Sequence, residues 1–231
     1  MLSEAEWQIV ALSLKVSIVA MLLTLPLAFA LAWVLARKRF AGRVLLDAIV
    51  HLPLVLPPVV TGWLLLLAFG AQGPVGRALD SLFGATVMFR WTGAAIAAAI
   101  MALPLMVRAI RLSIEGVDRK LEGAARTLGA GPWRSFFEIT LPLSLPGVLA
   151  AMVLGFARSI GEFGATITFV SNIPGETRTL PLAIYTALQV PGGETMATRL
   201  AIISVALSLI ALVASEALAR RSHAARTGHV L

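Results

Sequence analysis

Long apolar runs alternate with short polar stretches along the whole chain. Five runs carry almost no charge and reach or approach the roughly 20 residues that a helix needs to cross a bilayer core of about 30 Å. They cover residues 16–36, 48–76, 91–107, 139–157 and 200–219. Lipid offers no hydrogen-bond partners to the backbone, so spanning segments of this kind must be helical. The pattern predicts an all-α polytopic membrane protein of about five transmembrane helices, with residues 1–231 forming a single domain.

Basic residues predict the orientation of these spans. The stretches after the first, third and fifth runs hold 13 of the 19 Lys and Arg: Arg37, Lys38, Arg39, Arg43, Arg108, Arg111, Arg119, Lys120, Arg126, Arg134, Arg220, Arg221 and Arg226. The positive-inside rule then places the N-terminus outside, the C-terminus in the cytoplasm and a loop of about 108–138 on the cytoplasmic side. Glu4 and Glu6 stand where a signal peptide would be basic, so we expect the first span to be retained.

Composition removes several classes of function. Hydrophobic residues make up 58% of the chain and charged residues 13%, with a mean hydropathy of +0.90 and no Cys. The net charge is +7, but the basic residues flank the apolar runs and do not form a water-facing surface. The charge therefore does not indicate nucleic-acid binding. No Lys follows a Gly, so a P-loop for ATP is excluded. An intramembrane hydrolase centred on His51 is the enzymatic alternative, although no nucleophile or second titratable partner is identifiable beside it.

The cytoplasmic loop contains a short helix with its own stop signal. Its sequence is LEGAARTLGAGP over 121–132, in which Ala124, Ala125 and Leu128 form a compact face and Gly129, Gly131 and Pro132 end the helix. A compact face allows another surface to approach closely. The alternative is an interfacial loop helix of the kind found in many polytopic proteins.

At this loop the sequence resembles the membrane subunits of ATP-binding-cassette importers. Their signature is E-A-A, three residues, G, nine residues, I, one residue, L-P. The matching positions are Ala124, Ala125, Gly129, Ile139, Leu141 and Pro142. Gly123 stands at the glutamate position, with Glu122 one residue before it. The resemblance implies the type I importer permease fold and a coupling helix that docks on a cytoplasmic ATPase. It further implies two ATPase copies that hold ATP and Mg²⁺, no cofactor on this chain, and a place in the bacterial cytoplasmic membrane.

Three stretches narrow the resemblance to the oxyanion branch of these importers. Residues 157–166 are similar to molybdate, tungstate and sulfate systems, whereas 172–179 and 51–58 are closest to molybdate permeases. This implies import of molybdate, and of tungstate too, with an extracytoplasmic molybdate-binding protein and a second copy of the chain as partners. The alternatives are a sulfate or thiosulfate permease, for which two different membrane subunits are usual, and a scaffold that recruits a cytoplasmic protein without transport.

Polar residues at membrane depth are the candidates for the translocation pathway or gate. Arg158 and Glu162 are four apart and can pair on one helix face. Prolines interrupt the second span, as broken helices beside a cavity do, and small or hydroxyl-bearing residues follow the fourth. The candidates are Pro57, Pro58, Arg158, Gly161, Glu162, Gly164, Thr166, Thr168, Ser171 and Asn172. The alternatives are a packing ion pair, a packing kink and a surface loop around Pro174 and Gly175.

Overall fold

The computed structural model describes residues 2–227, without the side chains at 215, 216 and 218–227. All regular structure in this part of the chain is helical, as predicted. The elements are α1 (Glu4–Arg37), α2 (Arg43–Val55), α3 (Pro58–Phe69), α4 (Pro74–Phe83), α5 (Trp91–Glu115), α6 (Arg119–Thr127), α7 (Pro132–Ser135), the π-helical turn η1 (Phe136–Thr140), α8 (Leu141–Ile160), α9 (Gly164–Val170), α10 (Leu180–Leu188) and α11 (Glu194–Thr227).

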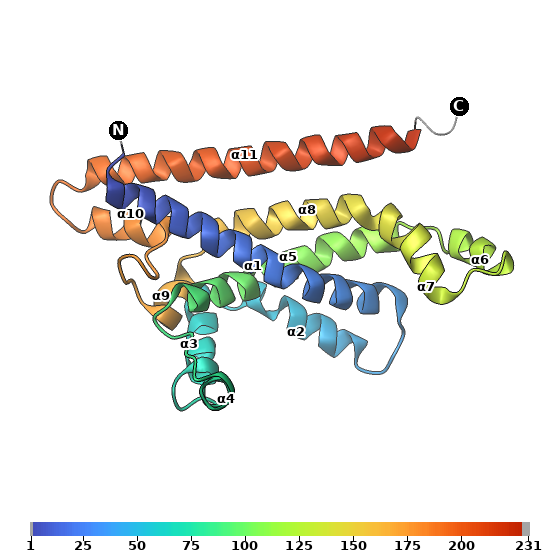
Figure 1. Cartoon of the computed structure of the whole chain (residues 1–231), viewed down its shortest axis with the longest axis horizontal. Helices are drawn as coiled ribbons and strands as arrows, with labels where there is room; N and C mark the ends of the chain where they lie inside the picture. The colour runs from blue at the N-terminus through green and yellow to red at the C-terminus, as the bar shows by residue number, and fades with distance from the viewer. Residues whose placement is uncertain (1, 228–231) are drawn as a thin grey trace.

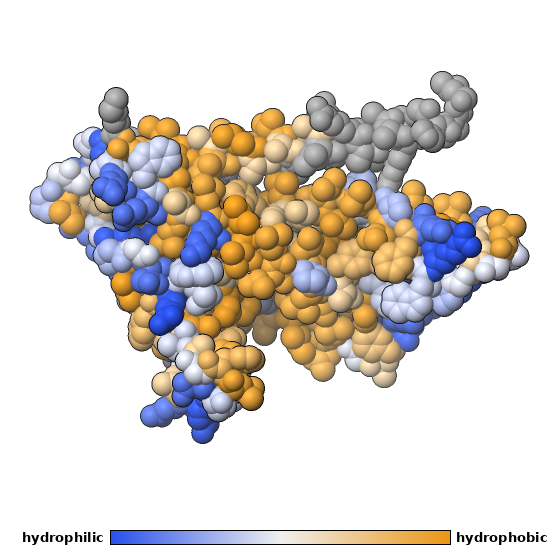
Figure 2. Space-filling view, in the orientation of Figure 1, coloured by the Kyte–Doolittle hydropathy of each residue, from blue (hydrophilic) through white to orange (hydrophobic). Residues whose placement is uncertain are grey.

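Four helices are long and apolar enough to cross a membrane. They are α1, α5, the continuous helix Pro132–Ile160 and the segment Glu194–Ala214 of α11. In Figure 1 these helices run together along the long axis of the molecule. Figure 2 shows a band of hydrophobic surface between two more hydrophilic ends, which is the surface that a bilayer requires.

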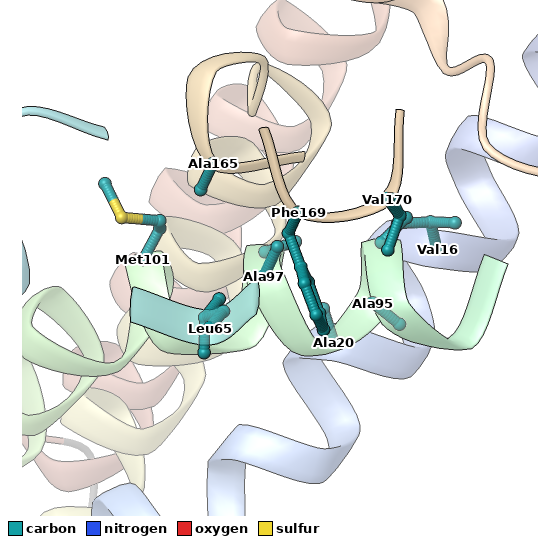
Figure 3. Packing of buried hydrophobic residues seen from close by; sticks show 11 residues of the cluster. Val16, Ala20, Leu65, Ala95, Ala97, Met101, Ala165, Phe169 and Val170 are labelled. Carbon is teal, nitrogen blue, oxygen red and sulfur yellow. The ribbon is translucent and has the colours of Figure 1, made fainter. Parts of the chain in front are cut away.

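Helix α5 lies at the centre of the bundle and packs against α1 and α8. Small residues of α5, including Ala94, Ala97 and Ala98, are buried and let neighbouring backbones approach closely. Val16 and Ala20 of α1, Leu65 of α3, and Phe169 of α9 pack on this face. Figure 3 shows Phe169 reaching from α9 into the cluster, so the core joins the long helices to the short ones.

The second predicted span is broken. Helices α2 and α3 meet at an angle of 115° at Leu56 and Pro57. A residue before a proline is forced out of the helical region, and the Pro57-Pro58 pair imposes this on both Leu56 and Pro57, whose ψ angles are 141° and 135°. Pro53 lies inside α2 and does not end it. Figure 1 shows α3 leaving the bundle sideways with α4 at its tip.

Several helices extend beyond the apolar runs that predicted them. Helix α1 begins at Glu4, where Ser3 and Glu6 form a reciprocal capping box. Helix α5 continues to Glu115, and the helix that contains α8 begins at Pro132. The connection on this side is therefore residues 116–131 with α6, shorter than the expected loop of about 108–138, because polar helical turns extend past the apolar core.

The two ends of the bundle differ in charge as the positive-inside rule requires. The C-terminal end of α1, α6 and the end of α11 lie at one end in Figure 1, and the start of α1 with the α10–α11 connection lies at the other. Arg37, Lys38, Arg119 and Arg126 lie at the α6 end, which is therefore the cytoplasmic side. The predicted cluster Arg220, Arg221 and Arg226 lies outside the described side chains.

Candidate functional site

Helix α6 is the short loop helix that the sequence predicts. The side chain of Asp118 caps its start by accepting a hydrogen bond from the N–H of Lys120 at 2.9 Å. Gly129 ends it with φ of +87°, a conformation that favours glycine. The N–H of Ala130 donates to the carbonyl of Ala125, and that of Gly129 to the carbonyl of Arg126. Both ends of α6 are thus fixed by local chemistry.

Glu122 attaches α6 to the spans. Its Oε1 lies 2.8 Å from Nη2 of Arg37, at the end of α1, and accepts a 2.7 Å hydrogen bond from the hydroxyl of Thr140, next to α8. The two side chains of the ion pair are 19% and 10% exposed. Local sequence could not reveal these partners, because Arg37 and Thr140 approach Glu122 only in the folded chain. These two contacts therefore attach α6 to the end of α1 and to the turn before α8.

The remaining signature residues lie along α6 and at the start of α8. Gly123 and Ala124 are exposed, whereas Ala125 is partly buried. Ile139 and Leu141 are also partly buried, and Pro142 is exposed. Between α7 and α8 the backbone widens into the π-helical turn, in which the N–H of Leu141 donates to the carbonyl of Phe136. Sequence analysis did not predict this turn, a feature that occurs frequently at functional sites.

Arg158 and Glu162 form the predicted ion pair. Their Nη1 and Oε2 atoms are 2.6 Å apart, and the side chain of Glu162 is 2% exposed. The other oxygen of Glu162 accepts a 2.8 Å hydrogen bond from the N–H of Ala165, in the first turn of α9. Glu162 thus neutralises Arg158 and caps α9 at the same time, while Gly161 ends α8. The structure connects the pair directly to α9.

Helices α3 and α9 are in very close contact beside this pair. A Cβ on Gly164 would lie 2.8 Å from Cβ of Pro58, and a Cβ on Gly62 would lie 2.6 Å from the carbonyl oxygen of Ala165. Only glycine fits at such separations. The structure therefore brings Gly164 against Pro58 at the break, and Thr168 against Gly62 of α3. Thr166 is buried, and Thr168 donates to the carbonyl of Gly164.

Ser171 and Asn172 belong to a hydrogen-bonded loop after α9. The carbonyl of Ser171 accepts from the hydroxyl of Thr177, and Ser171 has φ of +65°. Asn172 donates to Thr186 at 2.7 Å and accepts from Nε of Arg178 at 2.9 Å. Gly175 adopts φ of +77°, as expected for the predicted turn. Polar contacts within the loop and to Thr186 of α10 therefore hold it in place.

His51 is part of a structural network. Its Nδ1 lies 2.9 Å from the carbonyl oxygen of Asp47 and 3.2 Å from the Asp47 carboxylate. Both carboxylate oxygens of Asp47 accept from Nη1 of Arg111, which also pairs with Glu115. These contacts join α2 to α5. Asp47 is thus a titratable partner of His51 that the sequence analysis did not identify, whereas none of these contacts involves a nucleophile.

The chain matches a known protein family over nearly its whole length. Residues 9–223 match the family described as the binding-protein-dependent transport system inner membrane component. The chain is 63% identical over 221 residues to the molybdenum transport system permease protein of Escherichia coli (strain K12), covering 96% of each. It is 58% identical over 216 residues to the protein of the same description from Haemophilus influenzae, covering 94% of each.

More distant relatives share the architecture. The sulfate transport system permease protein of E. coli (strain K12) is 38% identical over 199 residues, covering 86% of this chain and 71% of that protein. The crystal structure of a bacterial alginate ABC transporter contains a chain that superposes with a TM-score of 0.73 at 19% identity, covering 95% of this chain and 80% of that one. The fold is that of a type I ABC importer permease.

Proposed function

The chain belongs to the family of inner-membrane components of binding-protein-dependent transport systems, and from this premise we propose that it forms the membrane pathway of an ATP-driven importer for molybdate and tungstate. Members of this family are multi-pass, non-catalytic subunits of ABC importers that act with an ATPase and a binding protein. The assignment of the substrate rests on the 63% identity to a molybdenum transport permease across 96% of both chains, compared with 38% identity to a sulfate permease.

Tungstate follows from the chemistry of the substrate. Molybdate and tungstate are tetrahedral dianions of similar size, so a pathway of small and hydroxyl-bearing side chains does not distinguish them. Import of either dianion against an inside-negative potential costs about 4.6 kcal/mol per 100 mV, twice the cost for one charge. Uptake therefore needs ATP, which with Mg²⁺ is held by the partner ATPase, because this chain has no P-loop.

Helix α6 is the coupling element of the proposal. Leu121 and Ala124 of α6 and Leu128 directly after it are exposed, and Leu128 is 88% exposed. This face is available to a groove on the ATPase, while Glu122 on the opposite side attaches α6 to Arg37 and Thr140. Closure of two ATPase copies on ATP would move two α6 helices together, and the Glu122 contacts would pass that motion to α1 and α8.

A second copy of the chain completes the pathway. Four straight helices and one broken span enclose little central space, so two copies around a two-fold axis are needed. Helix α3 projects from the bundle (Figure 1), and we assign it to the contact with the second copy. Val59, Trp63 and Leu67 of α3 are 54%, 52% and 52% exposed. ATP-driven closure would open the pathway outward to the binding protein, and reset after hydrolysis would release the anion inside.

Uptake of radiolabelled molybdate tests the function. Cells that lack their own high-affinity system would express the chain with its ATPase and binding protein, and excess tungstate or sulfate would compete. We expect uptake that tungstate blocks and sulfate does not. Uptake of sulfate in place of molybdate, with a second and dissimilar permease in the purified complex, would instead favour the sulfate assignment.

The ion pair of Arg158 and Glu162 is the sharpest test of the pathway residues. A change of Arg158 alone leaves Glu162 unpaired, so the single variant tests packing as well as passage. The double variant R158Q/E162Q removes both charges and keeps an acceptor for the Ala165 N–H. If the pair contributes to passage, the double variant assembles normally with its ATPase yet loses molybdate uptake. Full uptake by the double variant would remove any direct role of the pair.

A further inference from the structure

A cationic cavity lies where the cytoplasmic end of α1 meets α6 and the π-helical turn. Its volume is about 420 Å³, and its charged lining residues are Arg37, Lys38, Arg119, Arg126 and Glu122. Four cations face one carboxylate, which gives the lining a net charge of +3 and favours an anion. Lys38 and Arg126 have no ion-pair partner among the residues that the structure describes, and Nζ of Lys38 lies 5.2 Å from the centroid of the Trp33 ring.

Three buried polar atoms of residues at this cavity have no hydrogen bond within the described part of the chain. They are Oγ of Ser135, a residue that is 2% exposed, and Nε and Nη2 of Arg37, of which Nη2 lies 2.8 Å from Oε1 of Glu122 in the ion pair. Both residues line the cavity. These atoms are covered by protein, so the cationic side chains that line the cavity, and not the buried atoms, would contact a ligand.

An apolar groove adjoins the cationic cavity. Its volume is about 430 Å³, and its lining residues are Phe29, Ala30, Trp33, Val34, Pro132, Trp133 and Phe136. Trp33, Pro132 and Phe136 line both spaces, so the cavity and the groove share a wall. One side of this wall is suited to an anionic group and the other to a hydrocarbon chain, and a single amphiphile can occupy both.

The position of the two spaces matches a membrane interface. Trp133 and Phe137, on the helix that enters the bilayer as α8, are 75% and 57% exposed, as aromatic residues at the interface are. Figure 2 shows hydrophilic residues at the α6 end directly beside the hydrophobic band. The cavity therefore lies at headgroup depth on the cytoplasmic side.

The cavity and the coupling surface use opposite faces of α6. Arg119, Glu122, Gly123 and Arg126 follow helical spacing and line the cavity. The exposed Leu128 lies on the other face and does not line it. A ligand in the cavity therefore leaves the surface that we assign to the ATPase free.

We propose that an anionic phospholipid of the cytoplasmic leaflet binds here, with its phosphate among the cations and an acyl chain along the groove. The phosphate oxygens neutralise Lys38 and Arg126, which line the cavity without an ion-pair partner among the described residues. Because Lys38 lies at the end of α1 and Arg126 on α6, the bound phosphate links the coupling helix to the first span, beside the Glu122–Arg37 contact.

Native mass spectrometry of the assembled importer in detergent tests the site, with titration of phosphatidylglycerol against phosphatidylcholine. We expect phosphatidylglycerol to bind more tightly. The variant K38Q/R126Q removes two unpaired cations and weakens this binding roughly tenfold to thirtyfold, as the loss of two charge contacts predicts. The variant A30F fills the groove at an exposed position without any change of charge, and it weakens binding as well.

The variant R39Q/R108Q is the matched control. Both residues are exposed on the cytoplasmic side and outside the cavity lining, so the same loss of charge leaves phosphatidylglycerol binding unchanged. Equal weakening by the two double variants would overturn the proposal in favour of general surface attraction. Equal binding of phosphatidylglycerol and phosphatidylcholine would also overturn it. So would displacement of phosphatidylglycerol by inorganic phosphate or molybdate, if the A30F variant binds phosphatidylglycerol as tightly as the wild type does.

Discussion

The attachment of α6 to the spans through Glu122 leads to a quantitative prediction. The variant E122Q keeps the size of the side chain and an acceptor for Thr140 but removes the charge that pairs with Arg37 at 2.8 Å. Loss of one partner from a fully buried pair costs about 3–5 kcal/mol, and a hydrogen bond to a charged group about 1.5–3 kcal/mol. Because the side chains retain 10% and 19% of their exposure, we expect a loss of about 2 kcal/mol in this contact.

Amide hydrogen exchange of the reconstituted importer measures this loss locally. A loss of about 2 kcal/mol raises the exchange of α6 amides roughly thirtyfold, if they open together with the contact. Exchange in the core of α5 stays unchanged. Coupling to transport predicts that E122Q also retains ATP hydrolysis while molybdate uptake per ATP falls.

Two comparisons make the result decisive. The variant E138Q breaks the pair with Arg134, in which the side chains are 58% and 70% exposed, and such a surface pair contributes only a few tenths of a kcal/mol. We expect E138Q to behave as the wild type does. A double-mutant cycle with R37Q measures the coupling energy of the Glu122 pair, and strictly additive effects of E122Q and R37Q would refute the reasoning.

Three further predictions concern backbone and network positions. G129A places a side chain at φ of +87°, which costs about 1–2 kcal/mol and frays the end of α6, so co-purification with the ATPase decreases. G62A places a Cβ 2.6 Å from the carbonyl oxygen of Ala165 and should separate α3 from α9, which lowers thermal stability and uptake. The Cβ of G161A meets nothing closer than 3.9 Å, so this variant is the control for thermal stability. H51A leaves molybdate uptake within about twofold of the wild type, because loss of one partly exposed contact costs about 0.4 kcal/mol or less. Complete loss of uptake in a well-folded H51A variant would instead indicate that His51 takes part in chemistry.

Much of the fold follows from interactions that are local in sequence. Apolar runs specify which segments become spanning helices, since the bilayer requires internal hydrogen bonding of each one. The stop of α6 at Gly129 and the break after Leu56 follow from the allowed backbone angles of glycine and of residues before proline. The pairing of Arg158 with Glu162 follows from helical spacing.

Tertiary structure decided the features that depend on approach between distant segments. The sequence could not assign Arg37 and Thr140 as partners of Glu122, or reveal that Gly62 must be small because Ala165 lies against it. The prolines indicated that the second span is interrupted, whereas the angle of 115° between α2 and α3 was set by the fold. Backbone preferences act within a few residues and can be read along the chain, whereas ion pairs and close packing depend on the positions of whole helices, which only the folded bundle sets.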